Sequence, residues 1–358
     1  MATIVFAGGG TAGHIEPALA VARAWRDKHA DDVICFIGTK TGLENTLVPA
    51  AGFKLAHIPR VSIVRKPSYS WLKFPFDLVR AVQRSRVILE SADLLFGFGG
   101  YVSAPAYIAA RLSGVPIVVH EANAKPGWAN RLGSYLSPYL AVAHGISSPR
   151  FTDARVTGLP LRLDVALAFR ESGSDWASAR DEAKKRLGFN QSAPLIFIMG
   201  GSQGSVAINT VIEGAIPLLL SQGISILHSV GSTNSLPAAA GAYRPVAYVN
   251  AMADAYLASD LIIARSGAVT CSEFRTLGRY ALFVPLPIGN GEQFHNARTL
   301  VEDGRAEIIE QRNFTTNYLT THFAELLIRS SEAPIYGSDI DLNAADKIVS
   351  LGECAITA

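Results

Sequence analysis

Thr3-Ile-Val-Phe-Ala-Gly-Gly-Gly-Thr-Ala-Gly-His14 is the stretch that decides the fold of the first half of this chain. An apolar run ends here in a glycine turn that leads into a helix-like segment, and Gly8, Gly10 and Gly13 satisfy the G-x-G-x-x-G spacing. Such a turn lets the backbone approach a ligand closely, and its free amides favour an anion. The alternative is a tight strand-to-helix turn that holds no ligand.

The same succession of strand, glycine turn and helix returns in the second half of the chain, at residues 196–204. Around both turns, short runs of Val, Ile, Leu and Phe alternate with helix-length segments, as expected for parallel strands buried on both faces. We therefore predict two doubly wound α/β sheets. The predicted strands are residues 3–7, 33–37, 94–98, 117–120, 140–143, 195–199, 224–230, 246–249, 261–264, 281–284 and 307–309. The predicted helices include residues 17–30, 170–185, 206–220 and 343–351.

The composition excludes several classes of protein. Apolar residues make up 49% of the 358 residues and charged residues 17%, which favours folded cores over disorder. Because 32 Lys and Arg face 30 Asp and Glu, the net charge of +2 gives no field that would attract nucleic acid. Three distant cysteines without a C-x-x-C pair predict neither disulfides nor a zinc site, which favours a reducing cytoplasm. No run approaches the ~20 apolar residues of a membrane span, so we expect any membrane contact to be peripheral.

His14 directly follows the first glycine turn, at the start of the predicted helix. An imidazole at a helix N-terminus tends to stay neutral, which suits a general base, although a helix-start or packing role is the alternative. A dinucleotide site also needs an acidic residue after the second strand. That place reads Ile37-Gly-Thr-Lys40, which weakens the main alternative function, an NAD(P)-dependent dehydrogenase.

Polar side chains follow several predicted strands of the second half. The amides of Gly200-Gly-Ser-Gln-Gly204 and the Ser202 hydroxyl suit a phosphate or diphosphate. Glu273 either accepts hydrogen bonds from a ribose diol or caps its helix. Open α/β sheets bind ligands at the carboxyl ends of their strands, where these loops lie. The loop after the next strand adds three side chains that suit sugar hydroxyls: Glu292, Gln293 and Asn296.

Together these segments resemble the MurG family of bacterial glycosyltransferases. The matching pieces run in order from Gly8 to Ala297: GGGTAGHIEPALA, GFGGYVSAP, PIVVHEAN, TGLPLR, GGSQGS, YVNAMADAYLASDLIIARSGAVTCSE and LFVPLPIGNGEQFHNA. The resemblance implies the GT-B architecture, two Rossmann-like domains facing a cleft. It implies an acceptor and membrane-facing domain over residues 1–161, a domain that binds UDP-N-acetylglucosamine over residues 162–340, and a C-terminal helix over residues 341–358 that returns toward the first domain.

The resemblance also implies the reaction. Such enzymes move N-acetylglucosamine from UDP-N-acetylglucosamine to undecaprenyl-diphospho-N-acetylmuramoyl-pentapeptide (lipid I), giving lipid II for peptidoglycan synthesis, cell shape and cell division. Val249 matches a backbone contact to uracil, Glu273 the ribose acid and Ser202 the diphosphate site, whereas Glu292 stands where some relatives carry glutamine. The other matched donor contacts are Thr11, Ala12, Gly13, Asn123, Arg162, Ala268, Val269, Thr270, Cys271, Ser272 and Gln293.

The implied chemistry displaces UDP with inversion at the anomeric carbon. It needs a base for the acceptor C4 hydroxyl, for which His14 is favoured over Glu121, and stabilisation of the leaving diphosphate. Amides of the second glycine turn and Arg162 can stabilise the diphosphate. Because no D-x-D triplet stands near a strand end, we predict that no metal cofactor is required, and a stimulatory divalent cation stays open. A non-catalytic module that binds nucleotide sugars is a further alternative, against which His14 argues.

One segment is strongly basic. From His57 to Arg86, seven basic residues face one acid, Asp77, so this segment carries +6 in a chain whose total is +2. Basic and aromatic residues together favour an interface with anionic lipid, whereas the alternative is a helix that packs on the sheet. We predict a helix beginning at Pro75 and peripheral docking on the cytoplasmic leaflet. The predicted membrane-facing residues are Trp71, Leu72, Phe74 and Phe76.

Overall fold

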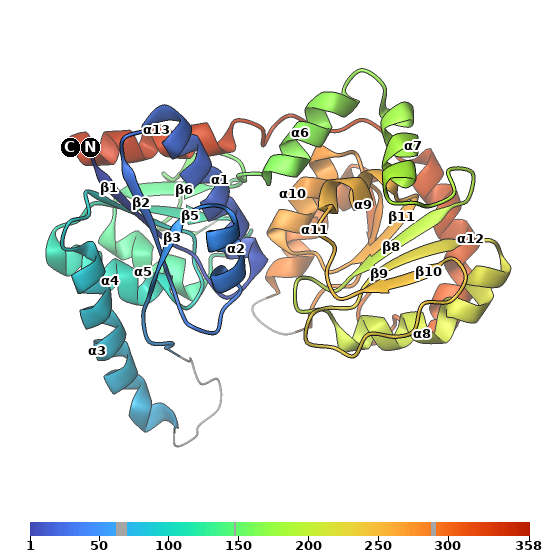
Figure 1. Ribbon diagram of the computed structural model, residues 1–358, viewed down its shortest axis with the longest axis horizontal. Helices are drawn as coiled ribbons and strands as arrows, with labels where there is room; N and C mark the ends of the chain where they lie inside the picture. The colour runs from blue at the N-terminus through green and yellow to red at the C-terminus, as the bar shows by residue number, and fades with distance from the viewer. Residues whose placement is uncertain (62–69, 147, 288–290) are drawn as a thin grey trace. The chain divides into compact units, whose positions relative to one another are not determined.

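The computed structural model describes residues 1–61, 70–146, 148–287 and 291–358, and the chain divides into two compact units (Figure 1). Unit 1 comprises Met1–Arg162 and Ile340–Ala358, and unit 2 comprises Leu163–Asp339. Each unit contains a parallel sheet covered by helices. The predicted class of two doubly wound α/β sheets is therefore confirmed.

The sheet of unit 1 has the strand order β3-β2-β1-β4-β5-β6-β7. The Phe6 ring stacks on the rings of Phe36 and Phe96, with centroid distances of 5.1 and 5.0 Å, so aromatic packing ties the three central strands together. The strands are β1 (Thr3–Ala7), β2 (Val33–Gly38), β3 (Lys54–His57), β4 (Leu94–Gly97), β5 (Ile117–Glu121), β6 (Tyr139–Val142) and β7 (Arg155–Val156). The helices are α1 (Ala12–Lys28), α2 (Glu44–Ala50), α3 (Ser70–Leu89), α4 (Ser103–Ser113), α5 (Trp128–Leu136) and α13 (Ala344–Thr357).

The sheet of unit 2 has the strand order β10-β9-β8-β11-β12-β13. Three of its four inner strands consist entirely of buried apolar residues, as in the Leu195–Met199 strand. The strands are β8 (Leu195–Met199), β9 (Ser225–Ser229), β10 (Tyr243–Val246), β11 (Leu261–Ala264), β12 (Ala281–Phe283) and β13 (Ala306–Ile308). The helices are α6 (Leu163–Ser172), α7 (Trp176–Arg186), α8 (Val206–Ser221), α9 (Met252–Ala258), α10 (Ala268–Thr276), α11 (Glu292–Glu302) and α12 (Thr316–Glu332).

Several predicted helix boundaries are wrong. Helix α1 begins at Ala12 and passes Pro17, and α3 begins at Ser70 and passes Pro75, so neither proline starts its helix. A proline near a helix N-terminus removes one backbone hydrogen bond, and packing of the helix offsets that loss. The charged segment 170–185, predicted as one helix, includes the end of α6 and most of α7. The chain breaks between them because Asp175 caps the start of α7 by accepting from the Ala177 and Ser178 amides.

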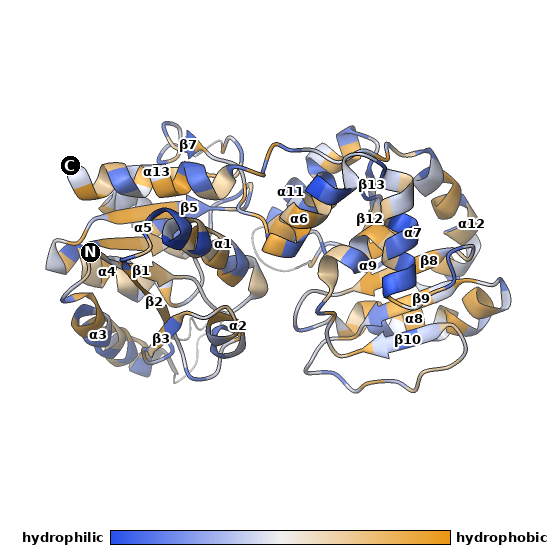
Figure 2. Ribbon diagram, turned by 45° about the horizontal axis from the view of Figure 1, so that its top comes forward, coloured by the Kyte–Doolittle hydropathy of each residue, from blue (hydrophilic) through white to orange (hydrophobic). Residues whose placement is uncertain are grey.

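The C-terminal helix α13 belongs to unit 1, where it packs on α1. Ile348 and Val349 enter the same core cluster as Trp25, and Glu353 pairs with Lys28 at 2.7 Å. Figure 2 shows hydrophobic and hydrophilic residues alternating along this helix. Its apolar face thus completes the cover over one face of the first sheet.

Candidate functional site

The first glycine turn joins β1 to α1. Gly10 has a φ of +93°, and a Cβ there would lie 2.7 Å from the Tyr101 ring. Gly100, after β4, also has a positive φ, and a Cβ on it would collide with the Gly9 carbonyl. Glycine is therefore required where these two turns pack against each other, at the carboxyl ends of neighbouring strands.

A carboxylate that no sequence motif indicated lies at this turn. Glu44, the first residue of α2, is 0% exposed. Its Oε2 accepts a hydrogen bond from the Gly10 amide at 3.2 Å, and its Oε1 accepts from the Thr39 amide and the Tyr101 hydroxyl, both at 2.9 Å. An amide that could receive a phosphate is thus bonded to an internal anion, which further weakens the dehydrogenase alternative.

His14 lies in the first turn of α1 and is half-buried. Its Nδ1 is 3.2 Å from Thr11 Oγ1, and a Cβ on Gly99 would lie 3.4 Å from its Nε2, so this glycine leaves room for the ring. Burial lowers the pKa of His14, although a hydrogen bond to the Gly9 backbone opposes this shift. The imidazole is therefore neutral at neutral pH, which is the form that a general base requires.

Glu121, the second candidate base, ends β5 and is 2% exposed. Its Oε1 accepts from the Asn123 amide and side chain at 2.8 and 2.9 Å, and its Oε2 accepts from the Gly127 amide at 2.8 Å and Asn130 Nδ2 at 3.1 Å. Burial raises the pKa of Glu121, and these hydrogen bonds oppose the shift. The carboxylate organises the loop after β5, including Asn123, so the geometry favours His14 as the base.

Arg162 is the last residue of the main segment of unit 1. Its Nη1 lies 3.5 Å from Glu16 Oε1, and the two side chains are 14% and 10% exposed. The buried charge of Glu16 on α1 is thereby explained by an ion pair. This pair holds the predicted diphosphate contact Arg162 against the helix that carries His14.

The second glycine turn, in unit 2, leads from β8 to α8, which Ser205 caps by accepting from the Ile208 amide. Gly204 has a φ of +77°, and a Cβ on it would collide with the Val230 carbonyl, so the turn packs closely on the segment after β9. Ser202, the predicted diphosphate contact, lies half-buried in this turn.

Arg265, which no sequence motif indicated as a functional residue, lies behind the second turn. Its side chain is 8% exposed, and it donates four hydrogen bonds. The acceptors are Val284 O at 2.7 Å, Pro285 O at 3.0 Å, Ser205 Oγ at 2.8 Å and Gln311 Oε1 at 2.6 Å. Because all four acceptors are neutral, they leave the positive charge of the guanidinium available to an anion near the turn.

Helix α10 carries the predicted ribose acid. Glu273 is 2% exposed, and its Oε2 accepts from the Tyr256 hydroxyl at 2.8 Å. The helix runs over Ala268–Thr276, so Glu273 lies beyond its first turn. Other predicted donor contacts differ in burial: Ala268, Val269 and Thr270 are half-buried, whereas Val249, Cys271 and Ser272 are buried.

Gln293 lies in the first turn of α11, directly after Glu292. Its Oε1 accepts from the Leu286 amide at 3.0 Å, and Asn296 Nδ2 donates to Ser266 O at 3.3 Å. The elements with Ser202, Glu273 and Gln293 follow β8, β11 and β12, which are neighbours in the sheet. Unit 2 therefore brings this part of the predicted donor set to one sheet edge. Five predicted contacts belong to unit 1: Thr11, Ala12, Gly13, Asn123 and Arg162.

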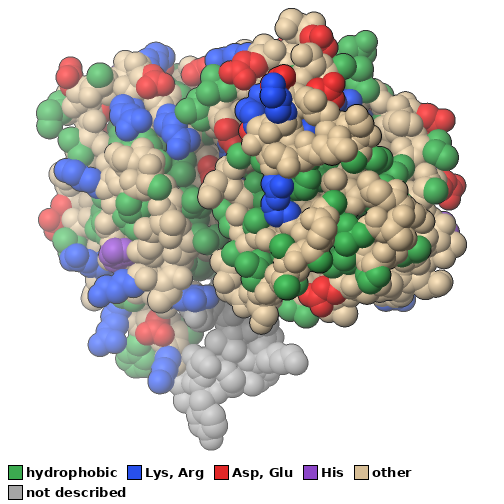
Figure 3. All heavy atoms as spheres, turned by 45° about the vertical axis from the view of Figure 1, so that its right-hand side comes forward, with side chains coloured by type: hydrophobic (Ala, Val, Ile, Leu, Met, Phe, Trp, Pro, Cys, Tyr) green, Lys and Arg blue, Asp and Glu red, His purple; other side chains and the backbone are tan. Residues whose placement is uncertain are grey.

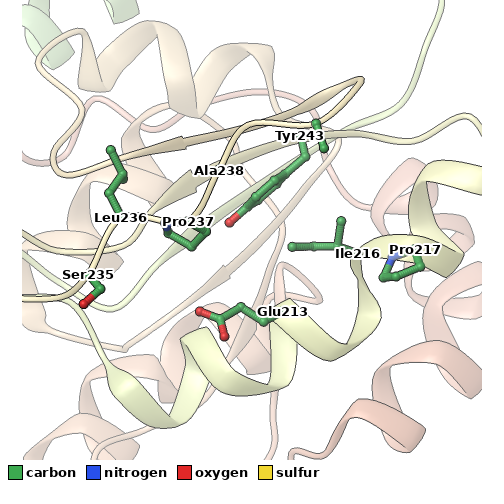
Figure 4. A pocket seen from close by; sticks show the side chains of 9 residues that line it. Glu213, Ile216, Pro217, Ser235, Leu236, Pro237, Ala238 and Tyr243 are labelled. Carbon is green, nitrogen blue, oxygen red and sulfur yellow. The ribbon is translucent and has the colours of Figure 1, made fainter.

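A separate hollow of about 450 Å³ lies on unit 2, between α8 and the segment before β10 (Figure 4). Its lining residues are Glu213, Ile216, Pro217, Ser235, Leu236, Pro237, Ala238, Ala240 and Tyr243. None of the predicted site residues is among them. Within the described ranges, no group of three or more His, Cys, Asp or Glu side chains is arranged to hold a metal ion.

Helix α3 presents two unlike faces. Phe74, Leu78 and Val82 are half-buried and pack against a core cluster of unit 1, and the membrane contact of Phe74 stays a prediction. Phe76 is 72% exposed and Val79 54% exposed. Figure 3 shows Lys and Arg side chains gathered at the lower left of this face of the molecule. The exposed basic residues of the helix are Lys73, Arg80, Arg84 and Arg86. The side chains of Trp71 and Leu72 lie outside the described part of the chain.

No helix among the described residues is both long and apolar enough to cross a membrane.

Comparisons with known proteins cover both units. Residues 4–140 match the glycosyltransferase family 28 N-terminal domain, and residues 195–335 match the family 28 C-terminal domain. The UDP-N-acetylglucosamine--N-acetylmuramyl-(pentapeptide) pyrophosphoryl-undecaprenol N-acetylglucosamine transferase of Corynebacterium glutamicum is 45% identical over 330 residues, which are 92% of this chain and 90% of the relative. The enzyme of the same name from Streptomyces coelicolor is 43% identical, over 90% of this chain and 89% of the relative.

The crystal structure of Acinetobacter baumannii MurG matches with a TM-score of 0.69 and 27% identity, covering 99% of this chain and 100% of that chain. This likeness and the two parallel sheets confirm the predicted GT-B fold class. The chain belongs to glycosyltransferase family 28 and, within it, to the MurG family.

Proposed function

We propose that the protein transfers N-acetylglucosamine from UDP-N-acetylglucosamine to the C4 hydroxyl of lipid I, with inversion at the anomeric carbon, giving lipid II. Relatives named for this transfer align with nearly the whole chain. The structural observation that carries the proposal is the second glycine turn, with Arg265 packed behind it. The helices that bear Glu273 and Gln293 follow the next two strands of the same sheet. A cation behind turn amides suits a diphosphate, and a buried acid on the helix after the next strand suits a ribose diol.

In this proposal the donor lies on unit 2. The turn around Ser202 and the Arg265 charge hold the diphosphate, Glu273 accepts from the ribose, and Gln293 contacts the sugar. The Val249 backbone meets uracil, and the half-buried segment from Ala268 to Thr270 lies by the sugar and α-phosphate. Thr11, Ala12, Gly13, Asn123 and Arg162 of unit 1 complete the donor contacts.

His14 acts as the general base in this proposal. When Nδ1 carries the proton and donates to Thr11 Oγ1, the Nε2 lone pair is available for the C4 hydroxyl proton. The hydroxyl oxygen attacks the anomeric carbon, and the bond to the diphosphate oxygen breaks. Charge on the leaving UDP is stabilised by turn amides, Arg265 and Arg162, so we propose that turnover persists when a chelator removes divalent cations.

The membrane contact is proposed for the exposed face of α3. Lys73, Phe76, Arg80, Arg84 and Val87 recur every three or four residues, which is one face of a helix. Phe76 would enter the interface, while the basic side chains meet anionic headgroups at about 1 kcal/mol each. This would bring a lipid-linked acceptor within reach of unit 1 at the cytoplasmic face of the membrane.

The test of the function is turnover with a lipid I analogue and radiolabelled UDP-N-acetylglucosamine, with titrations of UDP and NADH beside it. We expect labelled lipid II and binding of UDP but not of NADH. Binding of UDP without turnover would favour the alternative of a non-catalytic module that binds nucleotide sugars. Binding of NADH alone would favour the alternative of an NAD(P)-dependent dehydrogenase.

The membrane contact is tested by sedimentation with vesicles of phosphatidylglycerol or phosphatidylcholine. Binding should rise with the anionic lipid and fall with salt. The double substitution Phe76→Ser/Val79→Ser should reduce it, whereas Leu236→Ser/Ile328→Ser, which changes exposed apolar residues of unit 2, should not. Equal binding by both variants would refute docking through α3.

A further inference from the structure

We propose that Glu44 is a positioning residue for the reaction, because its carboxylate fixes the glycine turn that carries Thr11 and His14. The inference rests on the proposed function, in which His14 takes the acceptor proton. In this proposal Glu44 contacts neither the acceptor hydroxyl nor the donor. It acts through its hydrogen bond to the Gly10 backbone amide.

The carboxylate joins loops that follow three neighbouring strands. Gly10 follows β1, Thr39 follows β2 and Tyr101 follows β4, and β2-β1-β4 are adjacent in the sheet. Thr39 donates twice, through its amide at 2.9 Å and its hydroxyl at 3.2 Å. With the Gly10 amide and the Tyr101 hydroxyl, four donors surround one fully buried charge. Such a number of donors is what a buried carboxylate needs to remain charged.

Helix stabilisation does not account for this arrangement. An acid in the first turn of a helix usually favours the free amides of that turn. The hydrogen bonds of Glu44 instead go to Gly10, Thr39 and Tyr101, all outside α2. The side chain therefore serves the loops at the carboxyl edge of the sheet.

The path from Glu44 to the imidazole is short. Glu44 holds Gly10 directly through its amide and indirectly through Tyr101, whose ring packs beside Gly10. The next residue, Thr11, places its hydroxyl 3.2 Å from His14 Nδ1, and its carbonyl accepts from the His14 amide at 3.1 Å. A shift of Gly10 therefore moves the group that orients the base. Displacement of a catalytic group by about 1 Å can cost roughly a hundredfold in rate.

The substitution Glu44→Gln distinguishes a role in positioning the Gly10 turn from a role in stabilising the fold. Oε1 accepts three hydrogen bonds and Oε2 accepts only the one from Gly10. A glutamine keeps its carbonyl on the three-donor side, so its NH₂ group faces the Gly10 N–H and only that contact is lost. We expect kcat to fall roughly ten- to a hundredfold. We expect the KM for UDP-N-acetylglucosamine to change much less than kcat, because most of the proposed donor contacts belong to unit 2. We expect the UDP affinity to stay within twofold and amide exchange in residues 8–13 to accelerate.

The matched control is Asp32→Asn. Asp32 accepts from the Ala2 amide at 2.6 Å and Trp25 Nε1 at 3.0 Å, at the opposite edge of the same sheet. We expect this variant to lower Tm but to leave kcat unchanged. If Glu44→Gln does not fold, Glu44→Asp, which retracts the carboxylate from Gly10 but keeps its charge, should give the same split between kcat and KM.

A folded Glu44 variant with wild-type kcat would overturn the inference, as would a rise in KM without a fall in kcat. Wild-type protein that makes no lipid II would refute the proposed function instead. In that case the exchange of residues 8–13 decides the inference by itself, and unchanged exchange in Glu44→Gln would contradict it.

Discussion

The two glycine turns of this protein have the same strand–turn–helix pattern and opposite buried charges. In unit 1 the Gly10 amide meets the Glu44 carboxylate, whereas in unit 2 the Arg265 guanidinium lies behind the turn and bonds neutral acceptors. A glycine turn exposes amides, but the charge packed behind it decides whether an anion is favoured there. We therefore expect the donor diphosphate to bind at the second turn. At the first turn we expect the neutral imidazole of His14 to act as a general base.

The largest expected effect comes from removing the base at the first turn. His14→Ala should lower kcat by about 10²- to 10⁴-fold, the usual cost of losing a general base. UDP affinity should remain near that of the wild type, because the proposed diphosphate site lies on unit 2. Steady-state lipid II formation and calorimetric titration with UDP measure both quantities. Turnover close to the wild-type rate would remove His14 from the mechanism.

A change of charge behind the second turn should have the next largest effect. Arg265→Met should weaken UDP binding by about 1.5–3 kcal/mol, tenfold or more, because hydrogen bonds to a buried charged group are lost along with the charge. Arg265→Lys, which keeps the charge, should lose less. Calorimetry measures the affinity, and circular dichroism checks that each variant is folded. Unchanged UDP affinity in folded Arg265→Met would contradict the idea that the buried charge behind each turn decides where the diphosphate binds.

Two further substitutions divide the proposed donor site on unit 2. Glu273→Ala should weaken both UDP and UDP-N-acetylglucosamine by ~1–3 kcal/mol, because ribose hydroxyls lose their acceptor. Gln293→Ala should weaken only the sugar nucleotide, by a similar or smaller amount. Titration of each variant with both ligands makes the comparison. Equal losses for both ligands in Gln293→Ala would overturn its assignment to the sugar.

The smallest expected effect is a displaced pH profile. Burial lowers the pKa of His14 below its ordinary 6.5. The neutral base is therefore lost only when pH falls through that lowered value, so the acid limb of the kcat profile should lie below pH 6.5. Measurement of kcat across the acid range locates this limb. A limb above pH 6.5 would contradict the assignment.

Most central strands could be predicted from the sequence because they are continuous apolar runs. Three of the four edge strands could not: β3 and β7 were missed, and the predicted strand 246–249 lies three residues too late, since β10 is Tyr243–Val246. The fourth, β13, was predicted one residue late. In β10, Arg244 is exposed beside buried Tyr243 and Pro245, so the apolar run is broken. Edge strands bury less surface, and their sequences constrain them less.

The faces of α3 show a second limit of the sequence. Phe74 and Phe76 look alike by composition, but two residues turn a helix by about 200°, so one packs inward and the other points to solvent. The family resemblance and the local motifs together indicated His14, Ser202, Glu273 and Gln293. Their roles stay predictions.

Glu44 and Arg265 escaped prediction because their partners come from distant loops. Arg265 meets Ser205 and Gln311, which lie 60 and 46 residues away. Gly38 and Gly42, on which a Cβ would collide with Glu44, were the local signal for that carboxylate. The role of these two glycines depends on tertiary contacts that a short sequence motif cannot predict.

Hydrogen–deuterium exchange with and without UDP tests the contrast between the two turns most directly. The account predicts that UDP slows amide exchange in residues 200–205, at the second turn, more than anywhere in residues 8–13. Slower exchange in residues 8–13, with residues 200–205 unchanged, would place the diphosphate at the first turn and contradict it.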